Sequence, residues 1–123
     1  MSSSIIGKRL IYEGDIALEN KNYAEAINKY LESIKIGYFG EGESRLCMMA
    51  NSFNMGEIEE KNFPDLETLL ELGEKLLFSS GEDDVDKNEI KGAGYLILLN
   101  FIPEKEIPRD TRMYMNYLAD LNL

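Results

Sequence analysis

The chain has 123 residues and contains no histidine, no tryptophan, one cysteine and three prolines. Without histidine it can form no histidine-dependent catalytic triad and no histidine metal site, and it has no imidazole for acid-base catalysis. The single cysteine, Cys47, has no partner within the chain for a disulfide. Because no histidine is present to generate its thiolate, and because it sits beside two methionines in a predicted helix, we interpret Cys47 as a core residue.

Long apolar runs are also missing, since no segment approaches the roughly 20 residues that span a bilayer. The longest candidate, residues 95–99, is expected to belong to a core helix. The N-terminus lacks a basic region ahead of an apolar block, so no secretory signal is expected. These features predict a cytoplasmic protein without a membrane partner.

The remaining polar patterns do not match an enzyme or a cofactor site. No two carboxylates are tied by the sequence to an apolar pocket. Residues 84–90 alternate acids like the start of an EF-hand loop, but the sixth and twelfth positions hold Glu89 and Tyr95 instead of glycine and glutamate. Residues 92–94, Gly-Ala-Gly, lack the lysine and preceding strand of a phosphate-binding loop, and close helix packing explains them better. We therefore predict a non-enzymatic protein without metal or cofactor.

Basic residues are scarce in the middle of the chain, where the whole net charge of -10 arises. Residues 1–40 carry five acids and five bases, as do residues 87–123, whereas residues 41–86 carry thirteen acids against three bases. Such a field repels nucleic acid and anionic membranes and speeds encounter with a basic protein. The alternative reading is a solvated helix face followed by an acidic loop.

What is present is helical periodicity in a chain with 44% hydrophobic residues, enough for one domain over residues 1–123. Six helices are expected, over about 5–20, 23–37, 43–60, from Pro64 to a loop at 79–84, over 87–101, and from Pro108 past Leu121. Gly37 is expected to cap the second helix and Asp86 the fifth. The predicted fold is all-α, with three stacked antiparallel hairpins over residues 5–40, 43–80 and 86–123.

The spacing also predicts which side chains face inward. In the third helix these are Leu46, Met49, Ala50, Phe53 and Gly56, and in the fourth they are Leu66, Leu69, Leu70, Leu76 and Leu77. Met48, Met49 and Met55 either fill gaps in the core or line an adaptable binding surface, and we favour the core interpretation. Tyr38 and Phe39 either pin their loop to the core or project from it. The fifth helix is apolar on nearly every side, so it is either covered on several faces or partly exposed as a binding patch.

A 40-residue echo places Tyr23 in register with Phe63, Ala26 with Leu66, Tyr30 with Leu70 and Ser33 with Gly73. Residues 7–40 resemble a tetratricopeptide repeat through Gly14, Tyr23, Ala26, Tyr30 and Ser33. Leu10 and Tyr38 stand where that family usually has tryptophan and proline, and the later units resemble it by periodicity alone. The resemblance implies a protein-binding scaffold. Asp15 and Ile11 replace the asparagine and lysine of family members that grip a peptide carboxylate, so a basic or amide-rich ligand is expected instead.

Two hypotheses of function follow, with a third beside them. The first is an adaptor whose concave face, built from the first helix of each pair, binds a peptide or helix through Tyr12, Asp15, Glu19, Asn51 and Asn54. The second is an acidic immunity protein or antitoxin that inhibits a basic toxin, such as a nuclease, through Glu57, Glu59, Glu60, Asp65 and Glu67. A small secretion chaperone is the third. Each predicts a protein partner with a basic surface and leaves the oligomeric state open.

Overall fold

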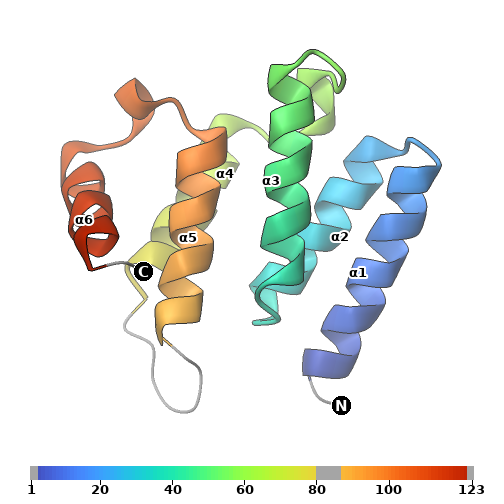
Figure 1. Cartoon of the computed structure of the whole chain (residues 1–123), viewed down its shortest axis with the longest axis horizontal. Helices are drawn as coiled ribbons and strands as arrows, with labels where there is room; N and C mark the ends of the chain where they lie inside the picture. The colour runs from blue at the N-terminus through green and yellow to red at the C-terminus, as the bar shows by residue number, and fades with distance from the viewer. Residues whose placement is uncertain (1–2, 80–86, 122–123) are drawn as a thin grey trace. The chain divides into compact units, whose positions relative to one another are not determined.

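The computed structural model describes residues 3–79 and 87–121, which form six α-helices and two short 3-10 turns without a strand (Figure 1). The elements are α1 (Ser3–Glu19), α2 (Tyr23–Lys35), α3 (Glu41–Asn54), η1 (Glu60–Asn62), α4 (Leu66–Leu77), α5 (Lys87–Phe101), η2 (Glu104–Glu106) and α6 (Arg109–Asp120). The predicted all-α fold class is confirmed. The chain divides into two compact units, residues 1–64 and 65–123, which are described separately. The predicted loop at 79–84, the Asp86 cap and the first residues of the EF-hand-like string fall mostly or wholly outside the described residues.

The first unit is built around α2, which packs against both α1 and α3. The inner stripe of α2 includes Ala26, Ile27, Tyr30 and Ile34, and each of these side chains is at most 1% exposed. Gly14 of α1 makes room for the Tyr30 ring, because a Cβ atom there would lie 2.6 Å from Tyr30 Cε1. The large aromatic ring of Tyr30 on α2 therefore packs into the space that a side chain would occupy at Gly14 of α1.

The contact between α2 and α3 also depends on small residues. A Cβ atom at Gly42 of α3 would lie 2.7 Å from Ser33 Oγ and 2.9 Å from the Tyr30 carbonyl oxygen. Ser33 is fully buried, and its hydroxyl donates to the same Tyr30 carbonyl at 2.7 Å. The serine thus fills the crossing point without leaving a buried hydroxyl unpaired.

All three helices of the first unit end with a residue in the left-handed region. Lys21 (φ 60°), Gly37 (φ 91°) and Gly56 (φ 81°) follow α1, α2 and α3. After Gly37, the Tyr38 amide donates to the Ser33 carbonyl at 2.9 Å, as in a Schellman cap. The predicted cap at Gly37 is confirmed. Tyr38 packs on α1, because a Cβ atom at Gly7 would overlap its ring, so it pins the loop to the unit.

The predicted end of the third helix is wrong. α3 ends at Asn54 and not at Glu60, and Gly56 does not face inward but forms the left-handed cap. The reason is that glycine adopts a positive φ without the steric cost that other residues incur. The chain then continues through η1, where Ile58 is 5% exposed and the Phe63 ring lies 5.3 Å from Phe53, edge to face.

In the second unit, α4 and α5 pack backbone against backbone. A Cβ atom at Gly94 of α5 would lie 2.5 Å from the Leu77 amide nitrogen and 2.7 Å from the Gly73 carbonyl oxygen. Close helix packing, predicted for the glycines of residues 92–94, is confirmed at Gly94, whereas Gly92 has nothing within 4 Å. The fifth helix was predicted to pair with the sixth, but the extensive contact of α5 in this unit is with α4.

The start of α4 corrects the prediction that Pro64 opens the helix. Asp65 is the N-cap, and its side chain accepts a hydrogen bond from the Thr68 amide at 2.8 Å. The helix therefore begins at Leu66, whose side chain is 44% exposed instead of buried. Leu69 and Leu77 are buried, as the spacing predicted.

Side chains fasten α6 to the rest of the second unit. Thr111, which is 3% exposed, donates its hydroxyl to Glu74 Oε2 at 2.5 Å. The Tyr114 ring stacks on Phe78 at a centroid distance of 5.2 Å, and Lys91 Nζ lies 5.0 Å from the Tyr114 centroid. These contacts attach α6 to both α4 and α5.

We predict that Lys21→Gly stabilises the protein. A side chain at positive φ costs roughly 1–2 kcal/mol, part of which glycine loses again through its greater freedom in the unfolded chain. The free energy of unfolding measured in urea should rise by about 0.5–1 kcal/mol. Lys21→Ala is the control, because it removes the same charge and keeps the Cβ atom. An equal gain in both variants would contradict the backbone explanation.

The two neighbouring glycines of α5 provide a matched pair. Gly94→Ala should lower the free energy of unfolding by about 1–3 kcal/mol, because its methyl group meets the backbone of α4. Gly92→Ala should instead raise it by about 0.5–1 kcal/mol, because alanine favours helix and has open space at this position. Thermal and urea unfolding of both variants measure the difference. Equal effects would show that α4 and α5 do not approach as closely as described.

Candidate binding groove of the first unit

Asp15 on α1 lies at the centre of a polar network that joins three helices. Its Oδ1 accepts a hydrogen bond from the Tyr30 hydroxyl of α2 at 2.7 Å and from Arg45 Nε of α3 at 2.6 Å. Arg45 Nη2 donates to the other oxygen, Oδ2, at 3.1 Å, so the guanidinium binds the carboxylate through two parallel bonds. Asp15 is half-exposed, with 42% of its side chain accessible.

The network fixes the charge state of its members. Burial raises the pKa of Asp15, but the hydrogen bonds from Arg45 and Tyr30 outweigh it and hold this pKa below its usual value of 3.8. Burial and the hydrogen bond to Asp15 raise the pKa of the Tyr30 phenol. The hydrogen bond to Asp15 also raises the pKa of Arg45. None of the three groups therefore titrates near neutral pH, and the network supports structure instead of proton transfer.

A groove of about 290 Å³ lies beside this network, and we call it the Met48 groove. Its lining residues come from the end of α1, the start of α2, α3 and the turn that follows: Leu18, Glu19, Lys21, Tyr23, Arg45, Met48, Met49, Ser52, Glu57 and Ile58. Met49 and Ile58 are buried, at 3% and 5% exposed, whereas Met48 is 68% exposed. The groove thus has an apolar base, an exposed thioether and acidic side chains from two segments.

The carboxylates of Glu19 and Glu57 make no hydrogen bond or ion pair to another side chain within residues 3–79 and 87–121. Arg45, by contrast, is committed to Asp15 and also donates to the Glu41 carbonyl oxygen at 3.2 Å. The formal charges that remain available to a ligand in the groove are therefore mainly the two glutamates and Lys21.

The structure brings some predicted site residues together. Glu19 and Glu57 both line the Met48 groove, and Asp15 lies behind its Arg45 wall. The other three predicted residues of this set do not line the groove. Tyr12 is 67% exposed on α1, and Asn51 and Asn54 are exposed on α3.

The other predicted acids fall outside the groove. Glu59 and Glu60 are exposed in the turn after α3, where Glu59 lies 3.5 Å from Lys61 Nζ. Asp65 and Glu67 belong to the second unit, at the start of α4. The hydrogen bonds from Thr68 lower the pKa of Asp65, because a negative charge is favoured at a helix N-terminus. Asp65 therefore has a local structural role.

Arg45 was not predicted as a site residue, and the burial of two methionines was predicted incorrectly. Met49 is buried as predicted, but Met48 and Met55 are 68% and 71% exposed, so their assignment to the core is wrong. A signal existed in the sequence, since Met48 lies one turn after Arg45 and one position before the buried Met49. A helical wheel therefore places Met48 beside the arginine and away from the core stripe.

Cys47 is half-buried, and burial together with the nearby Glu43 raises the pKa of its thiol. A raised pKa leaves less thiolate at neutral pH, so Cys47 lacks the activation of a catalytic cysteine. Among the residues that the structure describes, no group of three acidic or cysteine side chains is placed to hold a metal ion. Within the same residues, no helix is both long and apolar enough to cross a membrane.

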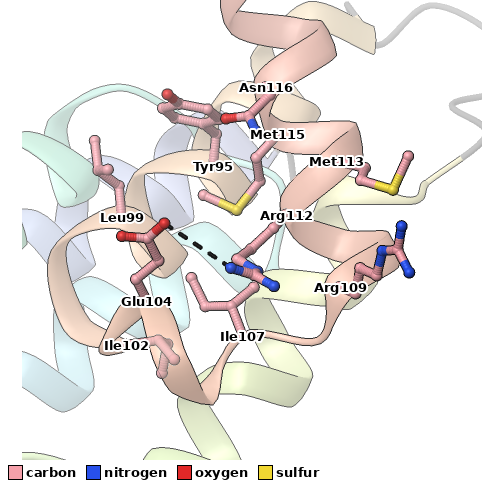
Figure 2. Close-up of a pocket in the computed structure, with 10 residues that line it drawn as sticks. All are labelled: Tyr95, Leu99, Ile102, Glu104, Ile107, Arg109, Arg112, Met113, Met115 and Asn116. Atoms are coloured by element: carbon pink, nitrogen blue, oxygen red, sulfur yellow. Dashed lines mark ion pairs between the residues drawn. The ribbon is translucent and has the colours of Figure 1, made fainter.

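The second unit contains a larger pocket of about 720 Å³, which we call the Arg112 pocket (Figure 2). Side chains of α5, η2 and α6 line it: Tyr95, Leu99, Ile102, Glu104, Ile107, Arg109, Arg112, Met113, Met115 and Asn116. In Figure 2 the Arg112 guanidinium lies in the middle of the pocket and faces Glu104, with Ile107 next to it. None of these residues was predicted individually as a site residue, although Tyr95 and Leu99 belong to the helix for which a partly exposed binding patch was one expectation.

Comparison with protein-family models, with curated proteins and with solved structures finds no match to this chain.

We predict that Asp15→Asn lowers the free energy of unfolding at pH 7 by about 1–2 kcal/mol, a value reduced for the partial exposure of the carboxylate. The folded-state pKa of Asp15 lies below the unfolded value near 3.8. Its stabilisation is therefore complete above about pH 5 and is lost as the pH falls through the folded-state pKa. Urea unfolding should show the gap between wild type and variant closing towards pH 2. Glu32→Gln, at an exposed site on α2, is the control and should show no such gap.

Proposed function

We propose that this chain is a non-enzymatic protein-interaction module, similar in design to a tetratricopeptide repeat. Its Met48 groove would bind a peptide or helix that carries basic or amide side chains, in the cytoplasm. The observation that supports this most is that the exposed Met48 lines the same groove as Glu19 and Glu57, which form no ion pair with another described residue. Methionines of this kind adapt to the apolar side chains of a partner.

The proposed charge selectivity follows from the neutralisation of Arg45. An arginine on a groove wall would attract acidic ligands, but Asp15 binds this guanidinium through both carboxylate oxygens. Glu19 and Glu57 then outweigh Lys21 among the groove charges that form no ion pair with another described residue. A basic or amide side chain can pair with these glutamates while an apolar neighbour covers Met48.

A second candidate function, inhibition of a basic toxin, is favoured by a separate observation. Glu57, Glu59 and Glu60 are all exposed in the four-residue stretch 57–60, which follows α3. The ion pair of Glu59 with Lys61 is exposed, with about three-quarters of both side chains accessible, so it contributes little stability and a basic group of a partner can displace Lys61. The acidic turn adjoins the Met48 groove through Glu57, so an inhibitor would use both surfaces.

Site-directed photocrosslinking tests the groove. A benzophenone amino acid at Met48 should capture a basic protein from the native lysate, and the same amino acid at the exposed Glu32 should not capture it. The yield at Met48 should fall several-fold between about 0.05 and 0.5 M salt, because screening weakens exposed charge pairs. Mass spectrometry identifies the partner. Equal capture from both positions would contradict the proposed groove.

Charge variants separate the two candidate functions. Glu19→Gln with Glu57→Gln should reduce capture at Met48 under the groove hypothesis, whereas Glu59→Gln with Glu60→Gln should leave it nearly unchanged. If the second pair has the larger effect and the partner is a toxin whose activity is blocked, the inhibitor reading is correct. Glu25→Gln with Glu32→Gln, on α2, is the matched control for lost charge. Unchanged capture by all three variants would exclude both acidic surfaces.

A further inference from the structure

The Arg112 pocket contains an arginine whose hydrogen-bonding capacity is largely unused. Its Nε atom is buried and has no hydrogen-bond partner among the described residues. Its only described ion pair joins Nη1 to Glu104 Oε1 at 4.0 Å. Guanidinium groups carry five donors and normally satisfy them in pairs against carboxylates. The Arg112 side chain is 43% exposed, so its terminal nitrogens remain accessible to a carboxylate that enters the pocket.

Glu104 is a weak counter-ion for this arginine. Its side chain is 85% exposed, and the contact lies at the outer limit of an ion pair. Exposed pairs of this kind contribute little, so another carboxylate can replace Glu104 at small cost. Figure 2 shows Glu104 reaching from η2 towards Arg112 at the side of the pocket, next to Leu99 and Ile102. Glu104 thus marks the place at which a carboxylate can meet Arg112.

The rest of the pocket is suited to an aliphatic group. Ile102, Ile107 and Met115 are at most 7% exposed and form the apolar base of the pocket. Leu99 and Met113 are each 58% exposed at its edges, so apolar surface continues outward. The volume of about 720 Å³ falls in the range of about 300–1,000 Å³ that is typical of small-molecule sites.

The second arginine of the pocket, Arg109, adds positive charge and has no counter-ion among the described residues. Its side chain is exposed. Two arginines against one glutamate give this pocket a local excess of positive charge in a chain whose net charge is -10. The Arg112 pocket and the Met48 groove therefore favour ligands of opposite charge.

We propose that the Arg112 pocket binds a monocarboxylate with an aliphatic body. The carboxylate displaces Glu104 and pairs with the Arg112 guanidinium, while the aliphatic body covers Ile102, Ile107 and Met115 and extends between Leu99 and Met113. A medium-chain fatty acid and the free C-terminus of a peptide ending in an aliphatic residue share this chemistry. The proposal concerns the second unit alone and does not depend on the proposed function of the Met48 groove.

Decanoate is the probe, and NMR of protein labelled at the methionine methyl groups is the measurement. Met113 and Met115 line the pocket, whereas Met48 is about as exposed as Met113 but belongs to the first unit. Decanoate should shift the Met113 and Met115 signals in a saturable manner and leave the Met48 signal unchanged. Decanol, with the same chain length and no charge, should bind at least ten-fold more weakly. Equal binding of the two probes, or equal shifts at Met48, would overturn the proposal.

Two variants with opposite expected effects accompany the probe. Arg112→Gln should weaken decanoate binding about ten- to a hundred-fold, because it removes the charged hydrogen bonds. Glu104→Gln should strengthen decanoate binding about two- to five-fold, because it removes the internal competitor. The Glu104→Gln measurement tests the proposal even if Arg112→Gln fails to fold. Unchanged affinity in Glu104→Gln together with unchanged affinity in a folded Arg112→Gln would overturn the proposal.

An additional experiment with a peptide distinguishes the two possible sources of the carboxylate. An acetylated tripeptide ending in leucine is compared as the free acid and as the amide in the same NMR experiment. Tighter binding of the free acid than of decanoate identifies a peptide C-terminus as the ligand class, and the reverse identifies a fatty-acid-like ligand. Both results require Arg112 for affinity and so support the site. Equal binding of the peptide acid and its amide, with no decanoate binding, would refute it.

Discussion

The bidentate contact between Asp15 and Arg45 is the interaction on which the first unit depends. It joins α1 to α3, and the hydroxyl of Tyr30 brings α2 into the same network. A partly exposed carboxylate with one monodentate partner would contribute little, but three directed hydrogen bonds to one aspartate fix the relative positions of three helices. The same contact removes Arg45 from the charges available at the Met48 groove. Structure and proposed selectivity therefore depend on one residue pair.

Small residues determine how closely the helices approach elsewhere. Ser33 meets Gly42 where α2 crosses α3, and Gly73 meets Gly94 where α4 crosses α5. The sequence echo had already placed Ser33 in register with Gly73. In both units the small residue near the end of one helix faces a glycine of the next helix, which gives the echo a packing explanation. Ala26 and Leu66, which are in register in the echo, differ in burial, since Ala26 is buried and Leu66 is 44% exposed.

Much of the fold was predictable because helix periodicity and caps are local properties. The start of α2, the bounds of α5, the Gly37 cap and the buried stripe of α2 follow from residue spacing alone. The early end of α3 was not predicted, because a glycine within an apolar pattern can be either an inward contact or a left-handed cap, and φ decides between them. The partners of Asp15 were not predictable either, since Arg45 lies thirty residues away in sequence. Of the candidate site, only Glu19 and Glu57 were anticipated among the groove residues.

The net charge of the chain is a poor guide to the charge of its candidate binding sites. Ion pairs within the protein determine which charged side chains remain available to a partner. Asp15 contributes to the acidic composition, but its charge is neutralised by the ion pair with Arg45. Glu104 forms only a long, exposed ion pair with Arg112. Glu19 and Glu57 keep their charge for a ligand, while Arg109 and Arg112 form a positive excess in a chain that carries a net charge of -10. A strongly charged protein can therefore present a groove for basic groups and a pocket for a carboxylate. In both proposals, the charges that lack an ion-pair partner among the described residues, and not the net charge, determine the expected ligand class.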